Sequence, residues 1–385
     1  MVVLKSPVAA TVVERSKKIE NNFITSPSKS LTANVNLKLK KKPYKFFPRL
    51  GIYAGYMNKD GIKKTENASA QIYGAESFSL IRPVSAKTAK SKGSLTWGLK
   101  KLGIDKIWKQ GISGKNIKVG HLDTGVDGKH SALKGKLAGF IETDANGDII
   151  PNKSVKHAHD TDDHGTHTAG TICGGKVNGM SIGVAPKSKL YSGLVIEGGD
   201  VLIRVLTGME WCLENNVRVL NMSLGFRGYT PFFIDVTRRL RQSGALPVFA
   251  IGNEGPNTSR SPGNYPEALS VGATNNVCRV ASFSSSIRFN RKVEPEQPNV
   301  VAPGVDVISA KPNGGVQAMS GTSMATPHVA GIAVLLFDSQ RDATVDDVER
   351  AIFETCKPVP NAKPIRYGLG YVDPQAAIAR LEKIV

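Results

Sequence analysis

One serine of this chain lies where its hydroxyl could act as a nucleophile. Ser323 stands between Gly321-Thr322 and an apolar run, residues 332–337. This pattern predicts a helix that begins near Ser323, and free backbone N–H groups and the helix dipole favour negative charge at such a terminus. The hydroxyl could therefore attack a carbonyl and leave the developing oxyanion stabilised. The alternative is an ordinary N-cap serine.

A carboxylate and an imidazole lie upstream of this serine. Asp123 ends a predicted buried strand, residues 117–122, and Thr124-Gly125 follows it, which suits a group that orients a histidine. His164 lies in the first turn of a helix predicted for the string DHGTHTAG. With a carboxylate upstream and a nucleophile downstream, His164 is a candidate general base. Aspartic proteases also use a D-T-G string, but they need two such carboxylates, and no second D-T-G occurs here.

The region around His164 is also rich in possible metal ligands. These are His157, His159, Asp160, Asp162, Asp163 and His167. The two histidines of HGTH are three residues apart and enclose no glutamate, unlike those of the H-E-x-x-H zinc motif. We therefore predict acid–base catalysis without a metal.

Three strings of the sequence resemble the signature blocks of the subtilisin-like serine proteases (subtilases). They are DTGVD, HGTHTAG and GTSMATPHVAG, in the order Asp, His, Ser that this family uses. The strings NMSLG and AIGNEG extend the resemblance, which runs from about Trp97 to about Pro374. It implies a serine endopeptidase that forms an acyl-enzyme with Asp123, His164 and Ser323. The side chain of Asn253 is then implied as a donor to the oxyanion.

The resemblance also implies where substrate binds. The implied substrate-binding residues are Ser223, Leu224, Gly225, Gly252, Glu254 and Arg260. An extended peptide would pair with residues 223–225 as an added strand. Gly225 and Gly252 would line the primary specificity pocket and leave room for a sizeable side chain. Arg260 could face this pocket and favour an acidic side chain, Glu254 at the rim would act in the opposite sense, and an outward or structurally paired arginine is the alternative.

Strands and helices alternate along most of the chain. Strands are predicted at residues 117–122, 217–224 and 246–251, and helices at residues 201–215 and 231–243. Such alternation predicts an α/β fold with a parallel sheet and helices on both faces, as the subtilisin-like resemblance also implies. Ligands of such sheets bind beyond the carboxyl ends of the strands, where Asp123 and Asn253 fall.

The N-terminal part of the chain differs in composition. We predict a basic flexible segment over residues 1–43, a small α+β domain over 44–84, a linker over 85–94 and the catalytic domain over 95–385. Short strands are predicted at residues 52–56 and 78–81. Subtilases usually carry an inhibitory prodomain, so the resemblance implies that residues 44–84 inhibit the enzyme within the same chain. The linker would then contain a self-cleavage site.

The net charge of +19 is concentrated near the N-terminus. Residues 1–110 hold 22 Lys and Arg against 6 Asp and Glu. We predict no specific nucleic-acid binding, because no such motif accompanies the charge. Two alternatives to a free protease stay open: a catalytically silent binding module of the same fold, and a protease tethered to an anionic surface by residues 1–45.

Cofactor and compartment are less constrained. The aspartate of the subtilases' tight calcium site is replaced by Ala132, and residues 174–183 offer few oxygen side chains. We therefore predict that no cofactor is required and that this tight site is absent, and calcium bound elsewhere stays an open alternative. The four cysteines are widely spaced and form no C-x-x-C pair. No apolar stretch is long enough to span a membrane. No signal peptide is evident, which leaves a cytoplasmic protein or export by another route.

Overall fold

The computed structural model describes residues 2–4, 19–24, 44–67, 70–72, 79–196 and 201–385. Its largest element is an eight-stranded sheet in which all strand pairs are parallel. In spatial order the strands are β23 (Gly370–Tyr371), β20 (Val300–Pro303), β17 (Leu269–Thr274), β15 (Leu246–Ala250), β13 (Val219–Met222), β8 (Lys118–Asp123), β12 (Lys189–Leu194) and β9 (Leu137–Glu142). The predicted α/β fold is confirmed, and the three strands predicted from sequence are β8, β13 and β15. The strand predicted at residues 217–224 ends at Met222, because the chain turns at Ser223 and continues as β14 (Leu224–Arg227).

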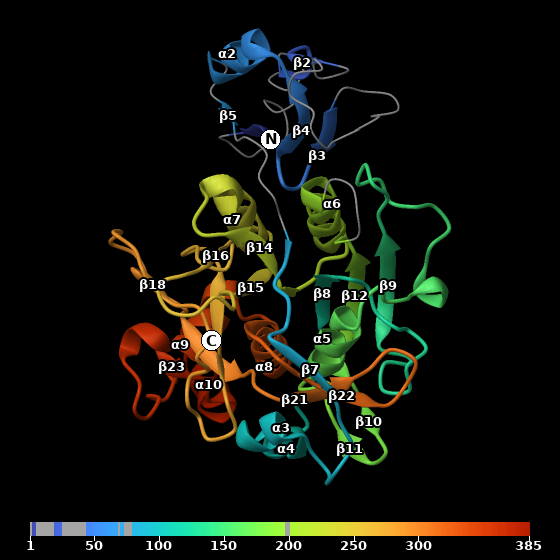
Figure 1. Ribbon diagram of the computed structural model, residues 1–385, viewed down its shortest axis with the longest axis vertical. Helices are drawn as coiled ribbons and strands as arrows, with labels where there is room; N and C mark the ends of the chain where they lie inside the picture. Colours follow the sequence, from blue (N-terminus) through green and yellow to red (C-terminus); the bar gives the residue numbers. More distant parts are fainter. Residues whose placement is uncertain (1, 5–18, 25–43, 68–69, 73–78, 197–200) are drawn as a thin grey trace.

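Helices cover both faces of this sheet (Figure 1). One face carries α5 (His164–Cys173), α8 (Thr322–Ser339), α9 (Val345–Phe353) and α10 (Pro374–Leu381), with α3 (Trp97–Lys101) and α4 (Ile104–Lys109) nearby. The other face carries α6 (Val201–Glu214) and α7 (Ile234–Gln242). Strand side chains alternate between the two faces, so Val119 of β8 joins the first hydrophobic cluster and Leu122 joins the second.

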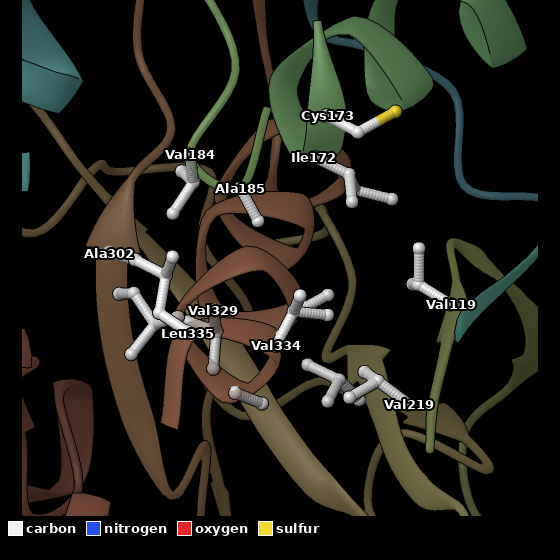
Figure 2. Packing of buried hydrophobic residues seen from close by; sticks show 14 of the residues in the cluster. Val119, Ile172, Cys173, Val184, Ala185, Val219, Ala302, Val329, Val334 and Leu335 are labelled. Atoms are coloured by element: carbon white, nitrogen blue, oxygen red, sulfur yellow. The ribbon is translucent and has the colours of Figure 1, made fainter. Parts of the chain in front are cut away.

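Helix α8 occupies the centre of the first face. It is apolar on all sides, and every residue from Thr322 to Phe337 is buried, as expected of a helix enclosed by other elements. Val329, Val334 and Leu335 of this helix lie in one cluster with Val119 and Val219 of the sheet (Figure 2). This packing holds the start of α8, and with it Ser323, at a defined place relative to the strand ends.

The N-terminal residues form a small α+β unit. Its sheet has the order β2-β4-β1-β5, and β3 also pairs with β4. The elements are β1 (Val2–Leu4), β2 (Phe23–Ile24), β3 (Tyr44–Phe47), β4 (Ile52–Met57), α2 (Lys59–Asn67) and β5 (Ala70–Ile72). Strands β1 and β2 come before the predicted boundary at residue 43 and pair with strands of this unit. Residues 1, 5–18 and 25–43, which make up the rest of the predicted N-terminal segment, lie outside the described residues.

The unit rests on the second helical face. The β3–β4 turn approaches α6, where the Glu210 carboxylate accepts hydrogen bonds from the backbone N–H groups of Arg49 (2.8 Å) and Leu50 (3.0 Å). Leu50 and Ile52 share a hydrophobic cluster with residues of α6 and α7. The contact thus combines apolar burial with two charge-assisted hydrogen bonds.

The described chain resumes at residue 79 and runs along the larger part from β14 to β22 (Val316–Ser320) (Figure 1). Strand β6 (Ser79–Leu80) pairs with β14, and β14 pairs with β16 (Arg260–Ser261). Strand β7 (Ser85–Thr88) pairs with β22, which forms a hairpin with β21 (Val307–Ala310). The first half of the predicted linker is therefore an exposed edge strand. Phe78 of the predicted strand 78–81 lies outside the described residues.

The remaining described elements are short. They are β10 (Lys176–Val177), β11 (Met180–Ser181), β18 (Ile287–Arg288), β19 (Glu296–Gln297) and the 3₁₀ turns Val155–His157, Pro231–Phe233 and Pro364–Arg366. None of the helices that the structure describes combines the length and the apolar character that a membrane crossing requires.

Candidate active site

Asp123 and His164 meet at the carboxyl end of β8. Asp123 is the last residue of that strand and His164 the first of α5, and both side chains are fully buried. The His164 ring atom Nδ1 lies 2.7 Å from Asp123 Oδ1, which also accepts the N–H of Thr124 at 2.8 Å. The carboxylate therefore fixes the orientation of the ring.

The two pKa values reflect this pairing. Burial alone raises the pKa of Asp123, but His164 and the Thr124 hydrogen bond outweigh burial, so the pKa lies below its ordinary value. Burial alone lowers the pKa of His164, but Asp123 outweighs it with help from Asp160 and Asp162, so this pKa is raised. Both shifts favour an imidazolium opposite a carboxylate.

Ser323 lies in the first turn of α8 and is fully buried. Its hydroxyl donates to the backbone oxygen of Ile81 at 2.7 Å. The ring atom Nε2 of His164 is buried and has no hydrogen-bond partner among the described residues. The serine hydroxyl thus contacts a carbonyl of the N-terminal segment, and a nitrogen able to accept its proton is left without a partner.

Asn253 follows β15, in the loop beyond the strand end. Its Oδ1 accepts the backbone N–H (2.8 Å) and the hydroxyl (2.9 Å) of Thr322, the residue before Ser323. Its Nδ2 donates to the backbone oxygen of Arg82 at 2.9 Å. The amide is thereby held with its donor toward the chain that lies over Ser323.

Residues 223–225 present a strand edge to this same chain. Leu80 pairs with Leu224 and Ser79 with Gly225 in antiparallel register, and Ile81 N–H donates to Ser223 O at 2.9 Å. The segment predicted to bind an extended peptide therefore binds residues of its own chain.

The family model described as the subtilase family, Peptidase_S8, matches residues 114–370. The chain belongs to the subtilase family. It is 33% identical over 290 residues to subtilisin of Bacillus pumilus, covering 74% of this chain and 98% of that protein. Similarity to subtilisin E of Bacillus subtilis (strain 168) is also 33% over 290 residues, covering 74% and 71% of the two chains. The major intracellular serine protease of the same strain is 32% identical over 268 residues, covering 67% and 79%.

The expected specificity pocket of this subtilase is occupied by an ion pair. Nε of Arg260 lies 2.8 Å from Glu254 Oε1, and Nη2 reaches the same oxygen. Arg260 is buried, and both members of the pair lie close to Gly252: a Cβ added there would lie 2.7 Å from Glu254 Oε2 and 3.2 Å from Cγ of Arg260. Burial alone raises the pKa of Glu254, but the hydrogen bond and charge of Arg260 outweigh burial, so the pKa lies below its ordinary value and the carboxylate stays charged. The room expected between Gly225 and Gly252 is thus partly filled, and the arginine is the paired one of the two alternatives.

This ion pair predicts a preference that two variants can test. Arg260→Gly is expected to raise kcat/KM for peptides with Phe before the cut about tenfold relative to Ala, because it opens the space beside Gly252. Glu254→Gln leaves the guanidinium charge uncompensated and is expected to raise the relative kcat/KM for Glu at that position. Peptides that differ only at this residue provide the measurement. An unchanged ranking of Phe, Ala and Glu in both variants would show that the pair does not select substrates.

The acidic and histidine-rich segment before α5 is held by ordinary contacts. Asp160 accepts hydrogen bonds from the hydroxyl of Thr124 (2.7 Å) and from the N–H of Thr166 (2.6 Å), and burial raises its pKa to about 6. His167 Nε2 contacts the backbone oxygen of Val307. In the described part of the chain no group of three or more His, Cys, Asp or Glu side chains could hold a metal ion. Ala132 is buried, and its backbone oxygen accepts from Gly175; the expectation about calcium stays a prediction.

Sequence reasoning did not find Ile81 and Arg82 as residues of the site. The apolar segment 78–81 indicated a short strand, but nothing in its side chains indicates which edge it joins. Its backbone carbonyls make the contacts with Ser323 and Asn253.

Proposed function

We propose that this subtilase is a serine endopeptidase that works through Asp123, His164 and Ser323 and an acyl-enzyme intermediate. The observation that carries the proposal is the buried 2.7 Å contact between His164 and Asp123. Nε2 of the same ring has no partner among the described residues, and α5 packs against α8, in whose first turn Ser323 lies. A binding module would have no need of a buried imidazole with one nitrogen unsatisfied.

The groups of the site would act in a defined order. When the Ser323 hydroxyl turns from Ile81 to His164 Nε2, the imidazole takes its proton as the oxygen attacks the substrate carbonyl. Asp123 stabilises the imidazolium that results. The Asn253 amide and the N–H of Ser323 receive the oxyanion. His164 then protonates the leaving amine, and water hydrolyses the acyl-enzyme by the same steps.

We further propose that the protein is made as a zymogen that cuts itself, with its N-terminal unit as inhibitor. The pairing of β6 with β14 supports this, because it occupies the edge that a substrate strand needs. The Ser323 hydroxyl contacts the carbonyl of Ile81, whereas the Asn253 amide contacts that of Arg82. Neither carbonyl therefore contacts the nucleophile and the oxyanion donor at the same time. Such an intact segment would block substrate until it shifts. The bond proposed for self-cleavage is Ile81–Arg82, which precedes the predicted linker at 85–94.

Labelling by a fluorophosphonate, a reagent for activated serines, tests this function. Full-length protein is incubated over time and sampled for probe label, for loss of an N-terminal fragment and for hydrolysis of casein. Label at Ser323 and casein hydrolysis are expected to appear together as the fragment leaves, since Ser323 is fully buried in the intact chain. Processed protein that neither takes up the label nor cleaves casein would refute the proposal in favour of a binding module.

A further inference from the structure

A second histidine lies behind the Asp123–His164 pair. His121 is two residues before Asp123 on β8 and is fully buried. The two side chains point to the same face of the sheet, the face that α5 covers, because strand side chains alternate. Both ring nitrogens have hydroxyl partners: Nδ1 lies 3.0 Å from Ser192 Oγ, and Nε2 lies 2.8 Å from Thr168 Oγ1.

Thr168 connects this ring to the carboxylate. Its Oγ1 lies 3.2 Å from Asp123 Oδ2, the oxygen that does not contact His164. Backbone oxygens of His164 (3.2 Å) and Gly165 (3.1 Å) are the other possible acceptors. The threonine hydroxyl has one proton, and a buried carboxylate is a stronger acceptor than a backbone carbonyl.

One assignment of protons satisfies every member of this chain. Ser192 donates to Nδ1 of His121, Nε2–H donates to Thr168, and Thr168 donates to Asp123 Oδ2. Each donor strengthens the next, since hydrogen bonds in series polarise one another in a low-dielectric interior. The members come from β12, β8 and α5, so the chain also ties these three elements together.

We propose that His121 is a positioning residue for the catalytic carboxylate, acting through the Thr168 hydroxyl. While Asp123 Oδ1 binds His164, this chain supplies the donor for Oδ2 and fixes the plane of the carboxylate. It also withdraws negative charge from Asp123 and so limits how far the carboxylate raises the pKa of His164. The expected effect on kcat rests on the proposed protease function, whereas the chain of hydrogen bonds does not depend on it.

The surroundings of His121 agree with a neutral ring. Burial lowers the pKa of His121 to about 4, which outweighs the opposite effect of Asp123. Ionisable groups that act on His121 or His164 are Asp123, Asp160, Asp162 and the two histidines themselves. The neighbouring strands β12 and β13 place Ser192 and Asn221, which do not titrate, in register with His121. The network is therefore expected to keep one protonation state above pH 5 or so.

Two substitutions of His121 distinguish the roles of its two ring nitrogens. The longer amide of His121→Gln can place a donor near Thr168, whereas the amide of His121→Asn reaches only toward Ser192. Thr168→Val removes the connecting hydroxyl at nearly equal volume. We expect His121→Asn and Thr168→Val each to lower kcat about tenfold with little change in KM, the double variant to lose no more than either single one, and His121→Gln to retain most of the activity.

The pKa of His164 is the second readout, and it does not need activity. Thr168→Val removes the hydroxyl that donates to Asp123 Oδ2, and His121→Asn removes the ring N–H that polarises this hydroxyl. Both changes leave more negative charge on Asp123, which raises the pKa of His164. NMR titration of His164 in a Ser323→Ala background measures this directly, and the acid limb of kcat/KM moves to higher pH by the same amount. His130→Asn, which removes a buried histidine that contacts Gly315 O and Ala132 N, is the matched control for lost packing.

If His121→Asn and Thr168→Val change the melting temperature but leave the His164 pKa and kcat unchanged, the inference is overturned. His121 would then be only a buried residue with satisfied hydrogen bonds. Equal losses in His121→Gln and His121→Asn would overturn it as well, since the donor to Thr168 would not matter. A raised His164 pKa in Thr168→Val supports the network even if no hydrolysis is found, in which case the proposed function fails and the network stands. Thr168→Val also decides the matter should the His121 variants not fold.

Discussion

A Ser323→Ala variant is expected to stay full length and to lose about 10⁶-fold in kcat, the size of effect reported for the nucleophile of subtilisin. The alanine removes the hydroxyl that donates to the Ile81 carbonyl. It leaves His164, Asp123 and the Asn253 contacts with Thr322 in place. The N-terminal unit should therefore remain bound over β14 and the site should remain closed.

N-terminal sequencing and intact mass measure this result. The wild-type chain should yield a new N-terminus at Arg82, while Ser323→Ala should not. Ser339→Ala, at the other end of α8, is the matched control, because its hydroxyl donates to Leu336 O within the same helix. Adding wild-type enzyme to the Ser323→Ala protein should release the same fragment. Cleavage of the variant in the absence of wild-type enzyme would contradict Ser323 as the group that cuts.

An Asp123→Asn variant is expected to process itself about 10⁴-fold more slowly than the wild type, as in other proteases with this triad. Its amide oxygen can still accept from His164 and Thr124, so the ring stays oriented. The negative charge is lost, however, and the imidazolium formed when Ser323 gives up its proton has no partner. The loss should appear in the rate of the chemical step and little in the stability of the N-terminal contact.

The direction in which the pH dependence of self-processing shifts in Asp123→Asn follows from the pKa of His164. Activity needs neutral His164, so it is lost as pH falls through the raised pKa of this histidine. Asp123 is the main cause of the rise, and its loss lowers the pKa. The acid limb of the self-processing rate should therefore move to lower pH in Asp123→Asn, opposite to the shift expected for Thr168→Val.

First-order rates of fragment release, followed by mass spectrometry between pH 4 and 9, provide the measurement. Asp127→Asn is a suitable control, since that carboxylate accepts from Lys129 N and Asn313 N outside the site. A rate within tenfold of wild type in Asp123→Asn would show that the carboxylate charge has no part in the reaction.

Much of the catalytic domain could be predicted from local patterns. Apolar strands alternating with helices indicated a parallel sheet. Asp123 ends β8 and Asn253 follows β15, two strands that β13 separates in the sheet. The strings around Asp123, His164 and Ser323 identified the family because backbone turns and close approaches restrict which residues can occupy those positions. The specificity pocket was harder to predict, because the sequence left Arg260 either facing the pocket or paired. Only the packing beside Gly252 places Arg260 against Glu254.

The contacts between distant segments could not be predicted in this way. Residues 2–4 looked like the start of a flexible tail, yet they pair with β4 and β5. His121 was part of a predicted buried strand, but its partners Thr168 and Ser192 come from other elements. By itself the sequence determined the family, the sheet and the reactive side chains, which are encoded in short strings. Only the tertiary structure decided that residues 79–82 lie across Ser323, because strand pairing uses backbone hydrogen bonds that any side chains can accompany.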